Sequence, residues 1–318
     1  MTRYARQIAV IGSAAQARFG QASVLVVGAG GLAAPVLQYL VGAGVGHVRV
    51  VDADHVSLSN LHRQTLFRVA DIAQPKVQVI AQAMAALNPD VTLQPIAARL
   101  DPANVDSLAR DMDLVLDCAD SFAASYILSD HCHKSGQPLI SGSVVGTNGY
   151  VGGFCGGGPG LRAVFPDLPD QLGSCDTDGV LGPSVGVIGS LQAEMALSVL
   201  AGDRTGLGQL VTYDARALRF GGFRFDMAVE PPATPAFIAT ADITDGDFVV
   251  DLRAVDEAGP ALPDACRHVV TDFAPVGPHP KDTQRAVLAC RSGLRAWQAA
   301  TRLSQYWPGE IKLIALGD

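Results

Sequence analysis

The sequence lacks the paired cysteines that mark most small metal sites and disulfide frameworks. Its 318 residues include six cysteines, none of which belongs to a Cys-x-x-Cys pair. A structural zinc site needs four soft ligands, and a disulfide framework needs an oxidising compartment. We therefore expect reduced thiols in a cytoplasmic protein and no zinc site. The six lie far apart, at Cys118, Cys132, Cys155, Cys175, Cys266 and Cys290.

Long runs of one charge are also absent, and so is a segment of secretory type. Acidic residues outnumber Lys and Arg by 31 to 23, with no basic run, which argues against nucleic acid as the main ligand. No charged stretch followed by an apolar one opens the sequence, so we expect no secretory signal. The apolar stretch 24–46 is long enough to cross a membrane. Its glycines fall where a strand, a turn and a helix need them, so we expect no membrane segment.

A strand followed by a glycine turn is the feature around which the first half is organised. Residues 24–27 predict a buried strand, and a helix is expected from Leu32 onward. Free backbone N–H groups at such a turn bind phosphate, and Asp52, after a second predicted strand, is placed for a ribose hydroxyl. Alone, this pattern favours an NAD-dependent dehydrogenase. The turn contains Gly28, Gly30 and Gly31.

Polar and charged side chains that follow the turn point to phosphate chemistry instead. Asn60, Arg63 and Lys76 supply an amide and two cations, which suit an enzyme that cleaves a triphosphate because charge builds on the leaving oxygens. Asp117 and Asp120 follow the predicted strand 114–117, at the edge where α/β sheets hold ligands. A carboxylate there can hold Mg²⁺ or cap the next helix, and we assign the Mg²⁺ to Asp120.

Taken in order, these motifs resemble those of the ThiF/MoeB adenylyltransferases, the bacterial relatives of ubiquitin-activating enzymes. The resemblance covers roughly the first 220 residues, and the motifs are specific as a set rather than singly. It implies an α/β fold with a Rossmann-like, mostly parallel sheet. The matching segments are Arg3-Tyr4-Ala5-Arg6-Gln7, Gly28-x-Gly30-Gly31, Asp52-x-Asp54, Ser59-Asn60-Leu61-x-Arg63-Gln64, Gln74-Pro75-Lys76, Asp117-Cys118-x-Asp120, Gly182-Pro183 and Gly186-Val187-Ile188-Gly189-Ser190-Leu191-Gln192-Ala193.

The resemblance implies ATP, Mg²⁺ and a partner, a small ubiquitin-like sulfur-carrier protein that ends in Gly-Gly. The partner's C-terminal carboxylate would attack the α-phosphate of ATP. Since a carboxylate is already ionised, the enzyme supplies positioning and charge neutralisation. Arg6 matches an arginine that reaches the triphosphate from a second subunit, which implies a homodimer. The residues placed at the nucleotide are Gly28, Gly30, Gly31, Asp52, Asp54, Asn60, Arg63, Gln64, Lys76 and Asp120.

Cysteines in and around this domain differ in what the resemblance implies for them. Cys175 matches a cysteine that is a candidate for covalent linkage to the activated protein or for carrying sulfur, whereas Asp176 and Asp178 should raise its pKa. Both interpretations stay open. Many relatives carry a Cys-x-x-Cys where this chain has Gly160 and Ala163, which again predicts no zinc.

A proline-rich stretch, 229–240, predicts a linker between an adenylating domain over 1–228 and a small α/β domain over 241–318. The expected strands of the second domain are 248–251, 268–271, 286–289 and 312–316. Cys290 lies between a strand and a helix start, flanked by Arg291 and Arg295. These charges predict a lowered thiol pKa and a resting thiolate.

The second domain resembles a rhodanese, in which the cysteine carries a persulfide. The resemblance rests on Asp251-Leu252-Arg253 and on the loop Cys290-Arg291-Ser292-Gly293-Leu294-Arg295. A Cys-loop phosphatase is the alternative, but its loop has one more residue between Cys and Arg, and the shorter loop suits a single sulfur atom better than a phosphate. An inactive, degenerate domain also stays open.

Combined, the two resemblances predict an enzyme that activates a sulfur carrier and helps convert its C-terminus to a thiocarboxylate. The sulfur would come from a donor such as a cysteine desulfurase, and the product would serve molybdopterin, thiamine or tRNA thiolation. Two alternatives are an adenylating enzyme for another carboxylate or peptide with a C-terminal docking domain, and a non-catalytic nucleotide-binding module. The candidate catalytic residues are Arg6, Arg63, Lys76, Asp120, Cys175 and Cys290.

Overall fold

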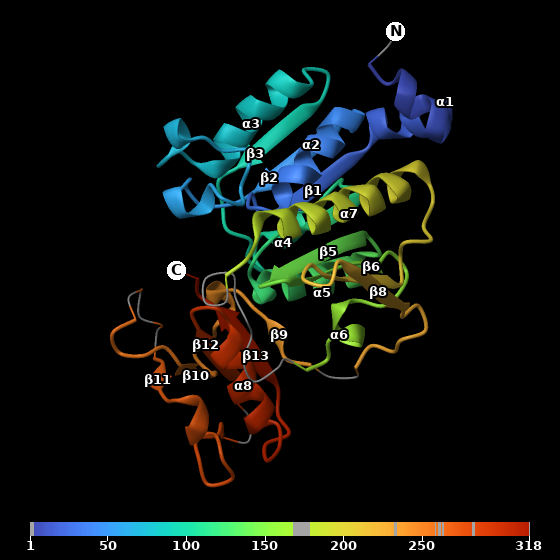
Figure 1. Ribbon diagram of the computed structural model, residues 1–318. Helices are drawn as coiled ribbons and strands as arrows, with labels where there is room; N and C mark the ends of the chain where they lie inside the picture. The colour runs from blue at the N-terminus through green and yellow to red at the C-terminus, as the bar shows by residue number, and fades with distance from the viewer. Residues whose placement is uncertain are drawn as a thin grey trace.

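The described residues form two β-sheets with helices packed on them (Figure 1). The computed structural model describes residues 3–317 except 168–178, 232–233, 258, 260–261, 263 and 282–283. Cys175 therefore lies outside the described residues. The first sheet has eight strands in the order β3-β2-β1-β4-β5-β6-β7-β8, and the second has five in the order β11-β10-β12-β13-β9.

The first sheet is parallel from β3 to β5 and antiparallel from β5 to β8. Its central strands are runs of Val, Leu and Ile that are buried on both faces, as parallel strands between helices must be. The predicted mostly parallel α/β sheet is confirmed for this domain. The strands are β1 (Ser23–Val27), β2 (His47–Val51), β3 (Thr92–Ile96), β4 (Leu114–Asp117), β5 (Pro138–Val145), β6 (Asn148–Cys155), β7 (Gln209–Asp214) and β8 (Arg219–Arg224).

Helices cover both faces of this sheet. On one face α2 and α3 pack together and α7 lies across β5 and β6, with α1 against α7. On the other face α4 and α5 pack on a core that continues into the second sheet. The helices are α1 (Ala5–Gln21), α2 (Ala33–Ala43), α3 (Lys76–Leu87), α4 (Val105–Leu108), α5 (Phe122–Ser135), α6 (Leu161–Val164) and α7 (Gly182–Ala201).

Helix α7 is long and apolar enough to pass a composition test for a membrane span, and it is the one helix among the described residues that does. Core helices pass the same test. In this structure α7 packs along α2 and across the sheet, and its buried side chains include Val185, Ile188 and Ala196. Its composition is therefore accounted for by burial against the first sheet.

The second sheet is parallel throughout. It consists of β9 (Ala236–Phe237), β10 (Phe248–Asp251), β11 (Cys266–Arg267), β12 (Ala286–Cys290) and β13 (Ile311–Ala315), with α8 (Leu294–Leu303) packed on β12 and β13. The edge strand β9 falls inside the stretch interpreted as linker. The short strands β9 and β11 carry no alternating pattern long enough to recognise.

The predicted strand at 268–271 is wrong. The strand of this region is β11, which ends at Arg267, and a 3₁₀ turn follows at Val270–Asp272. The Asp272 carboxylate accepts the N–H of Val269 at 3.1 Å and so closes the turn locally. An acidic side chain that bonds the backbone three residues earlier competes with strand pairing.

Candidate functional site

The site lies at the carboxyl edge of the first sheet, where β1 ends in the glycine turn. Gly28 has a φ of +95°, and a Cβ there would lie 2.5 Å from the carbonyl oxygen of Cys118. A Cβ at Gly31 would lie 2.7 Å from a methyl carbon of Val185. Glycine is thus required at both positions for steric reasons. Helix α2 begins at Ala33, so its free N–H groups are at the turn.

Two acids hold the backbone and a buried lysine next to this turn. The Asp52 carboxylate accepts the N–H of Ala29 and the N–H of Asp54, both at 2.7 Å, and burial raises its pKa. Lys76, at the start of α3, is 5% exposed and pairs with Asp54 at 2.7 Å. The desolvated ammonium group is costly unless an anion accompanies it, and here it pairs with Asp54 while its charge also acts on the buried Asp52. Because the Asp54 side chain is largely exposed, the cation beside the turn can also bind a phosphate.

A polar turn from residue 58 to residue 64 follows β2. The Asn60 carbonyl accepts the N–H groups of Arg63 and Gln64, and the Arg63 guanidinium donates to the Ser59 carbonyl at 3.1 Å. Gln64 is buried, and its Oε1 has no hydrogen-bond partner among the described residues. A Cβ at Gly30 would lie 3.6 Å from the Gln64 amide nitrogen. A buried acceptor beside the glycine turn fits a ligand with a hydroxyl or amino donor, as a nucleotide has.

The two acids after β4 have different environments. Asp117 is fully buried and accepts the Ser141 hydroxyl at 2.7 Å, and burial raises its pKa to about 6. Its backbone carbonyl accepts the Gln192 amide at 2.7 Å. Asp120 is exposed and precedes Ser121, which occupies the N-cap position of α5. The structure therefore leaves the Asp120 carboxylate to solvent rather than to a helix cap. Among the described residues no group of three or more His, Cys, Asp or Glu side chains could hold a metal ion, so Asp120 alone would be the protein's ligand to Mg²⁺.

An open groove of about 570 Å³ runs from the glycine turn along α7. Gly31 and Arg63 line it, together with Gln38 of α2, Thr65, and Glu194 of α7. The groove gives a ligand at the turn an open approach over α7.

Arg6 does not join this site within one chain. Gln7 and Gln16 of α1 donate to the carbonyl of Ala43, the last residue of α2. The glycine turn lies at the other end of α2, so Gln7, the neighbour of Arg6, is held at the end of that helix opposite the turn. Arg6 is exposed.

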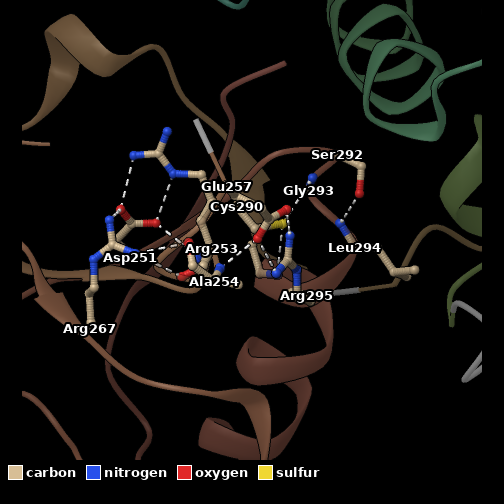
Figure 2. A network of polar contacts seen from close by, with 11 residues as sticks. Asp251, Arg253, Ala254, Glu257, Arg267, Cys290, Ser292, Gly293, Leu294 and Arg295 are labelled. Carbon is tan, nitrogen blue, oxygen red and sulfur yellow. Dashed lines mark hydrogen bonds and ion pairs between the residues drawn. The ribbon is translucent and has the colours of Figure 1, made fainter. Parts of the chain in front are cut away.

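The Cys290 loop lies in the second sheet, between β12 and α8. Cys290 is fully buried, and its sulfur accepts the N–H of Gly293 at 3.1 Å and that of Ala296 at 3.4 Å. Gly293 has a φ of +88°, which a glycine adopts without strain. The backbone of this loop is therefore wrapped around the sulfur (Figure 2).

The predicted lowering of the Cys290 pKa is wrong. Burial raises the pKa of the thiol, and the N–H groups of Ala296 and Gly293 and the charge of Arg295 offset that effect only in part. Arg295 is itself paired with Glu257, at 2.5 Å and 2.7 Å. Two arginines beside a cysteine suggested a thiolate, but the tertiary fold desolvates the sulfur and gives one arginine a carboxylate partner.

Comparison with known proteins identifies the family of the first domain. The sequence model of the ThiF family matches residues 4–232. The chain belongs to the ThiF family. The predicted membership of this family is therefore confirmed. The candidate nucleotide-site residues from Gly28 to Asp120 lie within the matched range.

Curated relatives of this ThiF-family chain are named as adenylyltransferases. It is 42% identical over 231 residues to the sulfur carrier protein adenylyltransferase of Thermus thermophilus. This match covers 69% of this chain and 85% of the relative. It is 40% identical over 205 residues to the adenylyltransferase and sulfurtransferase UBA4 of Yarrowia lipolytica. That match covers 63% of this chain and 52% of the relative, so the chain matches about half the length of that protein.

Solved structures agree on the fold. Escherichia coli MccB, in a crystal structure with MccA-N7isoASN, matches with a TM-score of 0.66 and 19% identity, covering 74% of each chain. At that identity the likeness shows the ThiF-family fold alone.

Two features of the sites were not found by sequence reasoning. The first is the hydrogen bond that the Gln192 amide of α7 donates to the Asp117 carbonyl. A polar residue within an otherwise apolar helix was the sequence feature that could have indicated it. Glu257 reaches the Cys290 loop from the segment after β10. Two adjacent acids, Asp256 and Glu257, stand in a stretch of mixed residues, and nothing in the sequence indicates which of them makes that contact.

Proposed function

We propose that this chain adenylates the C-terminal carboxylate of a ubiquitin-like sulfur-carrier protein and assists its conversion to a thiocarboxylate. The observation that carries the proposal is the buried Lys76 beside the glycine turn of a ThiF-family chain. The named activity of the Thermus thermophilus relative supports the choice of substrate.

In the first step, a carboxylate oxygen of the carrier bonds to the α-phosphorus of ATP, and the bond to pyrophosphate breaks. The N–H groups at the end of the turn, where α2 begins, bind phosphate oxygens, and the Gln64 oxygen accepts a donor of the nucleoside. Lys76, Arg63 and Asn60 stabilise charge on the phosphates as it develops. Asp120 would hold Mg²⁺, which neutralises phosphate charge when bound.

We place the active enzyme in a homodimer. Arg6 lies at the far end of α2 from the turn, so an Arg6 that contacts the triphosphate must come from a second copy. The open groove along α7 leads to the turn and offers an approach for such a group.

The sulfur step is assigned to the second domain. A donor such as a cysteine desulfurase would load Cys290, and the terminal sulfur would attack the acyl carbon of the adenylate, releasing AMP and leaving the carrier joined to Cys290 through an acyl disulfide. A second thiol would then attack the Cys290 sulfur, which releases the thiocarboxylate and leaves a disulfide that a cellular dithiol reduces. Cys175 is a candidate relay. The name of the UBA4 relative, which includes sulfurtransferase, supports this assignment. The five described cysteines are free thiols.

A second candidate function is adenylation of a carboxylate with no sulfur step, in which the second domain only docks a partner. The full burial of Cys290 favours it, because a buried thiol of raised pKa is a weak nucleophile at neutral pH. Under this alternative, Cys290→Ser leaves product formation unchanged.

The test is ATP–pyrophosphate exchange with the full chain, Mg²⁺ and a panel of small carrier proteins, each with and without its last glycine. We expect exchange with an intact carrier and loss of exchange on truncation. Absence of exchange with every carrier would contradict the proposal.

A further inference from the structure

Glu257 forms a fork-to-fork ion pair with the last residue of the Cys290 loop. Its Oε2 lies 2.7 Å from Arg295 Nη1 and its Oε1 lies 2.5 Å from Arg295 Nη2. The N–H of Ala254 donates to Oε2 at 2.5 Å and fixes the carboxylate from the other side. Both terminal nitrogens of Arg295 therefore have the geometry they would use on a bound oxyanion (Figure 2).

The Glu257 carboxylate stays ionised under ordinary conditions. Hydrogen bonds from Arg295 and from the Ala254 N–H, together with the charge of Arg291, lower the pKa of Glu257 to about 2. Glu257 is partly exposed, with 24% of its side chain accessible, so it lies where a ligand would approach the loop. A fixed negative charge is thus present beside the loop.

Two ligand classes differ in how they tolerate this charge. A tetrahedral dianion, such as a phosphate ester or thiosulfate, needs the Arg295 fork and is repelled by the carboxylate that already occupies it. A sulfur atom carried on Cys290 needs no fork, because it is a single atom bonded to a cysteine sulfur that the N–H groups of Gly293 and Ala296 hold in place. The loop therefore favours a single sulfur atom on Cys290 over a tetrahedral dianion.

We propose that Glu257 determines the specificity of the Cys290 loop, excluding tetrahedral dianions and restricting the sulfur donor to persulfides carried on thiols. The step rests on the persulfide role given to Cys290 above. The Cys290 thiolate attacks the outer sulfur of R–S–SH, the bond between the two donor sulfurs breaks, and R–S⁻ leaves. Cys290–S–SH forms, and the proton stays on the transferred sulfur. No external oxidant or reductant is needed.

The first arm of the test measures binding of inorganic tungstate, a tetrahedral dianion, to the full chain by calorimetry. We expect Glu257→Gln to bind tungstate at least about tenfold more tightly than the parent chain, because a contacting negative charge is removed. Glu257→Asp keeps the charge and should exclude tungstate. Glu310→Gln makes the same charge change at an exposed pair with Lys312 and should behave like the parent chain. Equal tungstate affinity in the parent chain and Glu257→Gln would overturn the proposal.

The second arm needs no variant and so does not depend on how well Glu257→Gln folds. The parent chain is incubated with thiosulfate or with glutathione persulfide, and the mass of the peptide that contains Cys290 is measured. We expect sulfur loading from the persulfide and at least about tenfold less from thiosulfate. Equal loading from both would refute the role of Glu257. Loading from neither donor would end the persulfide role of Cys290, whereas the tungstate comparison would still decide whether Glu257 excludes dianions.

Discussion

The rings of Tyr126 and Trp297 lie 4.9 Å apart between centroids and join α5 of the first domain to α8 of the second. The Arg162 guanidinium covers both rings, at 5.0 Å and 5.4 Å, and is held by the Asp130 carboxylate at 2.6 Å and 2.8 Å. Helix α5 starts next to Asp120 and α8 starts in the Cys290 loop. One interface therefore connects the two candidate sites.

This interface predicts an order of destabilisation for its charged pair. Arg162 is 7% exposed, whereas 35% of the Asp130 side chain is accessible. Asp130→Ala leaves a buried cation without its partner and should lower the free energy of unfolding by about 3 kcal/mol. Arg162→Met leaves only a partly solvated carboxylate and keeps an apolar side chain over the rings, so it should cost about 1 kcal/mol.

Urea unfolding followed by the fluorescence of Trp297, in a Trp307→Phe background, measures both changes. A larger loss for Arg162→Met than for Asp130→Ala would show that stacking on the rings, rather than the buried charge, holds the domains together.

The glycine turn predicts a difference between two glycines of similar backbone angle. Gly28 and Gly12 have φ values of +95° and +82°, but an added Cβ meets the Cys118 carbonyl at Gly28 and nothing within 4 Å at Gly12. Gly12 has a ψ of 162°, in a region that side chains rarely adopt, so Gly12→Ala should cost about 2 kcal/mol from the backbone alone. Gly28→Ala adds a clash with main chain and should cost about 2 kcal/mol or more beyond that. Thermal and urea unfolding of both variants checks this, and equal losses would mean that the backbone at Cys118 yields without cost.

Removing Lys76 should abolish most adenylation with little loss of stability. Lys76→Met fills the buried site with an apolar chain and leaves Asp54, whose side chain is 69% exposed, in solvent. We expect pyrophosphate exchange to fall by roughly 100-fold or more, because a cation at the phosphates is lost. Lys134→Met, at an exposed position in the last turn of α5, is the matched control and should keep full exchange. Undiminished pyrophosphate exchange in Lys76→Met would show that Lys76 takes no part in adenylation.

The reactivity of Cys290 should depend on pH as a buried thiol does. Burial raises its pKa above the usual value of 9.0, and the thiolate is the reactive form. The rate of alkylation by iodoacetamide should therefore keep rising beyond pH 9 rather than level off near neutrality. Mass spectrometry of the peptide with Cys290 follows the rate, with the half-buried Cys266 as an internal reference. A plateau below pH 7 would show that the arginines outweigh desolvation.

The first sheet and its site could be predicted from sequence because the signals are local. The apolar runs of β1 and β4 mark buried strands, and the glycines and acids that follow them are read within a few residues of each strand end. The candidate residues around Gly28 and Lys76 therefore come together at one edge of the sheet, as parallel strands require.

The features that sequence reasoning missed depend on distant contacts. Arg162 and Trp297 are 135 positions apart by their numbering, and nothing near either residue indicates the other. The Glu257–Arg295 pair and the burial of Cys290 likewise arise from the packing of the second sheet. The flanking arginines correctly indicated positive charge near Cys290. They gave no sign that the thiol is buried, and burial has the larger effect on its pKa.

The most direct test of the account is the mass of the carrier's C-terminus after incubation with the full chain, MgATP and a persulfide donor. We predict that one terminal oxygen is replaced by sulfur with the parent chain. Cys290→Ser should still exchange pyrophosphate but leave the carrier without sulfur, and Lys76→Met should do neither. A carrier that gains sulfur equally well with Cys290→Ser would contradict the role of the second domain, and a carrier that is never changed by the parent chain would contradict the proposed function as a whole.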